Sequence, residues 1–146
     1  MHNGTPQTDF IPEITVLCCR EALAGDFDFE GPDLPLQGCR ARRILLPCAG
    51  KIEASHLLKY LAAGVDGIEI ISCTDAHCPF LDGNTRVERR VAQARWLLSQ
   101  VAMAPDRIGL DHGEGLTAAQ VTALIEARAA AIRALGRNPM KKETTS

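Results

Sequence analysis

Alternating apolar and mixed segments divide the chain into short strands and longer helices. Four short runs rich in β-branched and apolar residues are typical of buried strands: residues 14–18, 44–47, 65–72 and 108–110. Apolar residues at helical spacing predict three helices over residues 52–63, 85–102 and 118–135. Strands that alternate with helices favour a parallel sheet covered by helices.

The ends of the predicted helices carry residues that start or stop a helix. Gly64 follows the first helix at the position that favours glycine, and Asn84 is an N-cap for the second. Thr117 opens the third helix and Gly136 closes it. Arg128 interrupts the apolar stripe of the third helix, so we expect its side chain to extend out to solvent.

These elements predict one folded unit. We expect residues 13–136 to form a single three-layer α/β domain, with a short, mostly parallel, flavodoxin-like sheet and helices on its faces. Residues 1–12 and 137–146 are polar and aperiodic, which is typical of flexible tails. A chain of 146 residues can bury a core without crosslinks.

Charge and hydropathy exclude several classes of partner. Sixteen basic and 18 acidic residues give a net charge of −2, which provides no general argument for binding nucleic acid or an anionic membrane. No apolar run approaches the roughly 20 residues that span a bilayer. The start, MHNGTPQTDF, lacks the basic and apolar regions of a signal peptide, so we expect a cytoplasmic protein.

The cysteines gather near the predicted strand ends. Six thiols in a cytoplasmic protein indicate metal binding or catalysis more than disulfides. Cys18 or Cys19 ends the first predicted strand, Cys48 the second and Cys73 the third, and Cys78 lies in the loop that follows. Parallel strands are about 4.8 Å apart and gather functional residues beyond their carboxyl ends. The pattern predicts a four-thiolate site, for an iron–sulfur cluster or for zinc.

Two cysteine positions need separate treatment. Cys39 precedes the second strand, so we expect it at the opposite edge of the sheet and outside the site. Cys18 and Cys19 are consecutive on a strand and point to opposite faces, so we expect only one of them to bind.

Other interpretations of the thiols stay open. A single buried cysteine is more often a small packing residue than a ligand. Zinc sites favour close cysteine pairs, so scattered ligands favour a cluster, although spacing alone does not decide between them. The alternatives are a zinc-stabilised α/β binding module, and a thiol enzyme or sulfur carrier that uses Cys73 or Cys78 as its nucleophile.

Histidines and arginines surround these positions. His77 adjoins Cys78 but is more typical of a solvated turn residue. We expect His56 on a helix surface and His112 in a loop, and neither with a cysteine neighbour. The predicted helix 85–102 is rich in arginine, which indicates either a solvated face or a face that docks a partner. Its arginines are Arg86, Arg89, Arg90 and Arg95.

Three segments carry a family resemblance. They are LPCAGKI (46–52), GVDGIEIISCTDAHCPFLDGN (64–84) and RVERRV (86–91). They resemble the C-S-G-(R/K)-(I/L) motif, the G-A-D-G-V…G-C-x₄-C-H-Y…G-N block and the arginine-rich helix of the delta-subunit family of the methyl-viologen-reducing hydrogenases. Glu114-Gly115 is similar to a further S-x-E-G element, and the resemblance extends over most of the chain from residue 14 to about residue 121.

This resemblance implies an electron carrier. It implies a [2Fe–2S] protein without catalytic activity of its own, which links a donor of the hydrogenase or formate dehydrogenase type to a heterodisulfide-reductase-A-like flavoprotein. It implies as cluster ligands Cys48, Cys73, Cys78 and either Cys18 or Cys19.

Two family features differ in this sequence. Many members have C-x-x-C after the first strand, whereas the second of these cysteines would fall here on Glu21 or Ala22. The family's usual His-Tyr after its last cysteine is Pro79-Phe80 in this chain. These differences bear on the partner and on the reduction potential more than on the existence of a cluster.

Overall fold

One parallel sheet organises the chain. The computed structural model describes residues 10–25, 38–47, 49–74 and 83–140, and the side chains of residues 83–85 are not described. The strands are β1 (Glu13–Cys19), β2 (Arg40–Leu46), β3 (Gly67–Cys73) and β4 (Ile108–Gly113), in the order β2-β1-β3-β4. The central positions of β1 and β3 explain why almost all of their residues are buried.

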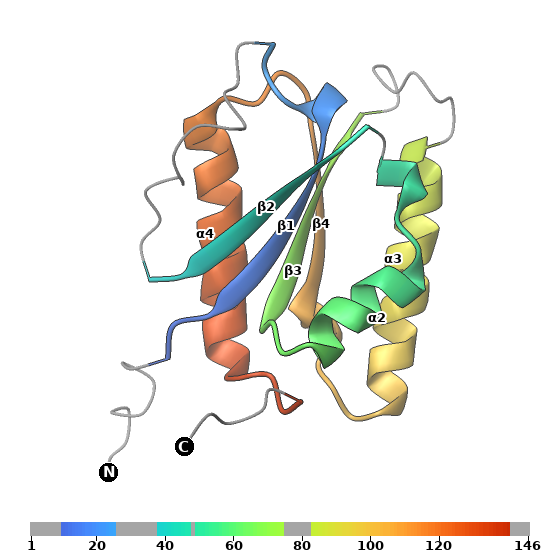
Figure 1. The fold of residues 1–146 in the computed structure, drawn as a ribbon, viewed down its shortest axis with the longest axis vertical. Helices are drawn as coiled ribbons and strands as arrows, with labels where there is room; N and C mark the ends of the chain where they lie inside the picture. The colour runs from blue at the N-terminus through green and yellow to red at the C-terminus, as the bar shows by residue number, and fades with distance from the viewer. Residues whose placement is uncertain (1–9, 26–37, 48, 75–82, 141–146) are drawn as a thin grey trace.

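Helices cover both faces of this sheet (Figure 1). On one face lie α2 (Ala54–Ala62) and α3 (Gly83–Gln100), and on the other lies α4 (Ala118–Leu135). Short 3-10 turns complete the described part of the chain: η1 (Arg20–Ala22), η2 (Ala49–Lys51) and η4 (Pro105–Arg107). In the described residues, no helix is long and apolar enough to cross a membrane. The predicted three-layer α/β domain with a flavodoxin-like strand order is confirmed.

The boundaries of β2 and α2 differ from the sequence-based prediction. β2 begins at Arg40, four residues before its predicted start, because it pairs with β1 from Glu13 onward. As the edge strand it exposes Arg40 and Arg42, so its first half lacks the apolar run that marks a buried strand. α2 begins at Ala54, after Glu53, whose backbone N–H donates to His56 Nδ1 at 3.1 Å.

The predicted caps of α4 are confirmed. The backbone N–H of Gln120 donates to Thr117 Oγ1 at 3.3 Å, and the backbone N–H of Thr117 donates to Gln120 Oε1 at 2.9 Å. Gly136 ends the helix with a φ of 89°, a backbone conformation that glycine adopts without strain.

Arg128 does not extend to solvent, so that prediction is wrong. Its Nε donates to Oε1 of Glu69 on β3 at 2.9 Å, and the Glu69 side chain is fully buried. Burial raises the pKa of Glu69 to about 9, assisted by a hydrogen bond to Asp111 and opposed by Arg128. Glu69 Oε2 is buried and accepts no hydrogen bond from the described residues, which favours the neutral, protonated carboxyl group.

A buried polar network closes the amino-terminal edge of the sheet. The Asp66 carboxylate accepts hydrogen bonds from the backbone N–H groups of Glu13 and Asn138, each at 2.9 Å. The Asn138 side chain donates to the carbonyl of Leu61 at 2.8 Å, and Arg107 donates to the carbonyl of Asp66 at 2.9 Å. Asn138 belongs to the segment expected as a flexible tail, yet it is 1% exposed, so the packed structure reaches at least this residue.

Candidate metal centre

The carboxyl ends of β1, β2 and β3 lie side by side at one edge of the sheet (Figure 1). Cys18 pairs in register with Leu45 of β2 and with Ile71 of β3. Cys73 ends β3 two residues beyond Ile71, and Cys19 ends β1. Because the strands are parallel, all three described candidate ligands lie at the same edge.

The other two candidate ligands, Cys48 and Cys78, lie outside the described residues. The described chain resumes at Ala49 in η2 after the first, and at Gly83 in α3 after the second. Both η2 and α3 lie on the α2 side of the sheet and contact each other (Figure 1). Within the described residues, no three Cys, His, Asp or Glu side chains form a metal-binding group, so a site here needs additional ligands.

Cys18 and Cys19 point to opposite faces of the sheet. Cys18 shares its face with Glu69, whose partner Arg128 belongs to α4. Cys19 shares its face with Leu17, which lines a pocket against α2. The two consecutive thiols therefore belong to different layers of the domain.

The described cysteines at this edge are buried and reduced. Cys18, Cys19 and Cys73 are 0%, 1% and 1% exposed, and none forms a disulfide with another described cysteine. Burial raises the pKa of the Cys18 thiol to about 12, although the Arg43 guanidinium acts in the opposite direction. In the absence of a cation, Cys18 is therefore a neutral thiol near pH 7.

Cys39 lies at the opposite edge, as predicted. It directly precedes Arg40, which pairs with Glu13 at the start of β1. Burial raises the pKa of the Cys39 thiol, and the negative charge of Glu126 adds to this effect. Cys39 is thus a packing residue separated from the other described cysteines by the length of a strand.

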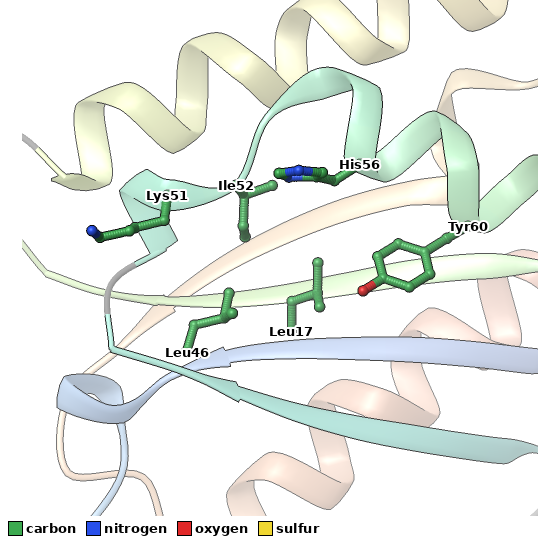
Figure 2. Close-up of a pocket in the computed structure, with 6 residues that line it drawn as sticks. All are labelled: Leu17, Leu46, Lys51, Ile52, His56 and Tyr60. Atoms are coloured by element: carbon green, nitrogen blue, oxygen red, sulfur yellow. The ribbon is translucent and has the colours of Figure 1, made fainter.

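An apolar pocket of about 230 Å³ adjoins the Cys19 face of this edge (Figure 2). The residues around it are Leu17, Leu46, Lys51, Ile52, His56 and Tyr60. Leu46 is the register partner of Cys19, which places the pocket beside the end of β1. The pocket contains no described thiol, and His56 Nδ1 already accepts the backbone N–H of Glu53.

His112 at the end of β4 contacts the cysteine-bearing edge, which the sequence did not predict. Its Nδ1 lies 3.3 Å from the carbonyl oxygen of Cys73, and its Nε2 lies 3.0 Å from Oε2 of Glu88 on α3. The parallel pairing of β3 with β4 places Ser72 opposite His112, although 39 positions separate His112 from Cys73. The expectation that His112 has no cysteine neighbour was wrong because it considered only the linear sequence.

Two of the arginines on α3 donate hydrogen bonds to backbone carbonyls of other segments. Arg90 Nη1 donates to the carbonyls of Gly50 and Ile52, each at 2.9 Å. Arg95 Nε donates to the carbonyl of Ile108 at 2.9 Å. The interpretation of four arginines as one docking face is therefore wrong for Arg90 and Arg95, whereas Arg89 is exposed.

Comparison with known proteins identifies the family of this chain. The family model described as methyl-viologen-reducing hydrogenase, delta subunit, matches residues 14–136. A relative from Methanocaldococcus jannaschii, named as the vhu iron-sulfur subunit of an F420-non-reducing hydrogenase, is 26% identical over 132 residues, 90% of this chain and 98% of that protein.

Another relative, from Archaeoglobus profundus and also named as the iron-sulfur subunit of an F420-non-reducing hydrogenase, is 31% identical over 135 residues, 90% of this chain and 95% of that protein. A vhu iron-sulfur subunit from Methanococcus voltae is 28% identical over 131 residues, with similar coverage of both chains. The family match covers all the described strands and helices except Glu13, the first residue of β1. The chain belongs to the delta-subunit family of the methyl-viologen-reducing hydrogenases.

Proposed function

We propose that this protein is an iron–sulfur electron-transfer subunit that works with a hydrogenase. The observation that carries the proposal is the edge of the sheet where Cys18, Cys19 and Cys73 end adjacent parallel strands. The relatives that match this chain are named iron–sulfur subunits of hydrogenases. A cluster transfers one electron at a time and needs no catalytic side chain around it.

The described residues suit such a group. Thiolates are the ligands of iron–sulfur clusters, and no disulfide joins the described thiols at this edge. The high pKa of Cys18 reflects how unfavourable an uncompensated thiolate is in this environment. Bound iron supplies the positive charge that compensates such a thiolate. A four-cysteine set is compatible with a [2Fe–2S] cluster, which is the type implied by the family resemblance.

We propose Cys48, Cys73, Cys78 and either Cys18 or Cys19 as the ligands. Cys19 lies on the face of the sheet that η2 and α3 cover. η2 directly follows Cys48, and α3 begins five residues after Cys78. Cys18 lies on the α4 face, beside Glu69 and Arg43. Cys73 is two residues beyond Ile71, the register partner of Cys18, so it shares the face of Cys18.

The proposed partners are two redox enzymes. The donor is of the hydrogenase or formate dehydrogenase type, and the hydrogenase is supported by the names of the relatives. The acceptor is a heterodisulfide-reductase-A-like flavoprotein, which is supported by the family resemblance alone. A site on strand-end loops suits both contacts, because such loops lie at the end of the domain.

Burial disfavours Cys73 as the nucleophile of a thiol enzyme or sulfur carrier, because it is only 1% exposed and a nucleophilic thiol must reach its substrate. Cys78, the other candidate nucleophile, lies outside the described residues. The zinc alternative uses the same ligands, and the metal content of the purified protein distinguishes it from an iron–sulfur cluster.

Anaerobic purification tests the proposal directly. We expect a brown protein with two iron atoms and two acid-labile sulfides per chain, and an electron paramagnetic resonance signal after reduction. A colourless protein with one zinc ion per chain would contradict the proposal. Anaerobic affinity purification followed by mass spectrometry then identifies the partners, which we expect to include a hydrogenase subunit and a flavoprotein.

A further inference from the structure

We propose that helix α3 positions the cysteine-bearing edge through two side-chain ties, and this inference depends on the proposed cluster. The first tie is Arg90, which binds the turn after β2. The second is the Glu88–His112 pair, which binds the end of β3. Neither tie contains a proposed ligand side chain, so both act by fixing backbone.

Arg90 holds the η2 turn against α3. A single nitrogen, Nη1, carries two hydrogens and donates one to each of the carbonyls of Gly50 and Ile52. Gly50 and Ile52 are buried, so their carbonyls depend on protein donors rather than on bulk water. η2 begins at Ala49, so this tie fixes the backbone immediately after Cys48.

The Glu88–His112 pair holds the end of β3. The Cys73 carbonyl can only accept, so the 3.3 Å contact is a hydrogen bond when Nδ1 of His112 carries a hydrogen, and Nε2 of the same ring lies 3.0 Å from the Glu88 carboxylate. His112 is thereby held between β3 and α3, and its Nδ1 hydrogen restricts the peptide group that follows Cys73. Such outer-shell contacts orient ligands and influence the potential of a cluster.

α3 can serve both ties because it is itself fixed. Val87, Val91, Ala94 and Leu98 form its buried stripe, each at most 2% exposed. Glu88 and Arg90 are two positions apart on the helix, so they point in different directions and reach different partners. The helix therefore holds the turn after β2 and the end of β3 at a fixed separation.

The first test uses Arg90→Gln, with Arg90→Lys as the conservative variant and Arg89→Gln as the control on an exposed arginine of the same helix. In metal-free protein, the Ile52 amide, which donates to the Ala49 carbonyl at 3.0 Å, reports the stability of η2. We expect Arg90→Gln to accelerate its hydrogen exchange about tenfold, with most of the protection restored in Arg90→Lys. In loaded protein, we expect loss of iron to a chelator to accelerate about tenfold.

The second test compares His112→Ala with His112→Asn. The asparagine amide can donate from the position of Nδ1, whereas alanine removes the donor. We expect His112→Ala to lower the reduction potential of the loaded protein, because a donor near the cluster is lost, and His112→Asn to recover most of the shift.

These outcomes distinguish a failure of the two proposed side-chain ties from a failure of the proposed cluster. Exchange at Ile52 in Arg90→Gln equal to that in Arg89→Gln overturns the Arg90 tie, and equal potentials in His112→Ala and the parent overturn the His112 tie. If the parent binds no iron, the proposed function fails, while exchange at Ile52 and at the Cys73–Thr74 segment of the metal-free variants still decides whether the ties exist. Circular dichroism checks that each variant is folded.

Discussion

Gly109 of β4 and Arg128 of α4 lie so close that the Arg128 guanidinium occupies the place of a side chain at residue 109. The guanidinium crosses β4 at this glycine and reaches Glu69 on the neighbouring strand β3, with an Nε–Oε1 distance of 2.9 Å. A Cβ at residue 109 would collide with the Nε, Cζ and Nη2 atoms of Arg128. The hydrogen bond between Arg128 and the buried Glu69 carboxyl group therefore requires that residue 109 has no side chain.

Gly109→Ala should reduce stability through this contact. The methyl group displaces Arg128 and leaves the buried Oε1 of Glu69 without its donor, which costs about 1 to 3 kcal/mol in the free energy of unfolding. Urea-induced unfolding followed by circular dichroism measures the loss. Gly25→Ala is the matched control, because an added Cβ at Gly25 meets nothing within 4 Å. Equal stability of the two variants would contradict the role of Gly109.

Glu69 should make the metal-free protein less stable as the pH rises. Its pKa is about 9 in the folded protein and near 4.5 in the unfolded chain, so the folded state holds more protons between these values. Stability from this group is therefore complete below about pH 4.5 and decreases toward pH 9. Its contribution to the slope is at most about 1.4 kcal/mol per pH unit.

Unfolding of the parent and of Glu69→Gln between about pH 5 and pH 8.5 measures this contribution. We expect the variant to lose the decline, since a glutamine amide does not titrate and still accepts from Arg128. A parent whose stability is independent of pH in this range, or a variant with an unchanged slope, would show that Glu69 is ionised in the folded state.

Serine variants of the cysteines should divide into two groups. Cys48→Ser, Cys73→Ser and Cys78→Ser remove proposed ligands and should lose the cluster, measured as iron and acid-labile sulfide per chain. Cys39→Ser should retain it, because Cys39 lies at the opposite edge. We expect one of Cys18→Ser and Cys19→Ser to lose the cluster, which assigns the fourth ligand. Retention of the cluster in both would contradict the proposed ligand set.

The sequence was informative where the determinants of structure are local. The Thr117 cap needs only Gln120 three positions later, and the buried strands β1 and β3 are apolar runs, so each could be predicted from its own segment. The parallel direction of the strands could then be predicted from the alternation of strands and helices.

The errors concern contacts between distant segments. Arg128 was expected at the surface because its buried partner Glu69 lies 59 positions away, and a helical pattern does not contain that partner. His112 was set aside because its contact with Cys73 requires the register of β3 against β4. Arg90 shows the same limitation, since charge spacing along a helix does not reveal carbonyl acceptors on another segment. The partners of these side chains can therefore be identified only in the three-dimensional structure, whereas the helices and strands can be predicted from the sequence.

Asn138→Ala should destabilise the protein although this residue follows the last helix. Its side chain donates to the carbonyls of Leu61 and Val65 and accepts from the backbone N–H of Met140. Alanine removes these three hydrogen bonds, although the Leu61 carbonyl keeps its bond from the Gly64 N–H. We expect the loss to cost about 2 to 4 kcal/mol in the free energy of unfolding, measured with urea. Met140→Ala is the control, because it removes a half-exposed side chain and keeps the N–H. A loss in Asn138→Ala no larger than in the control would mean that residues after 136 behave as a flexible tail in solution.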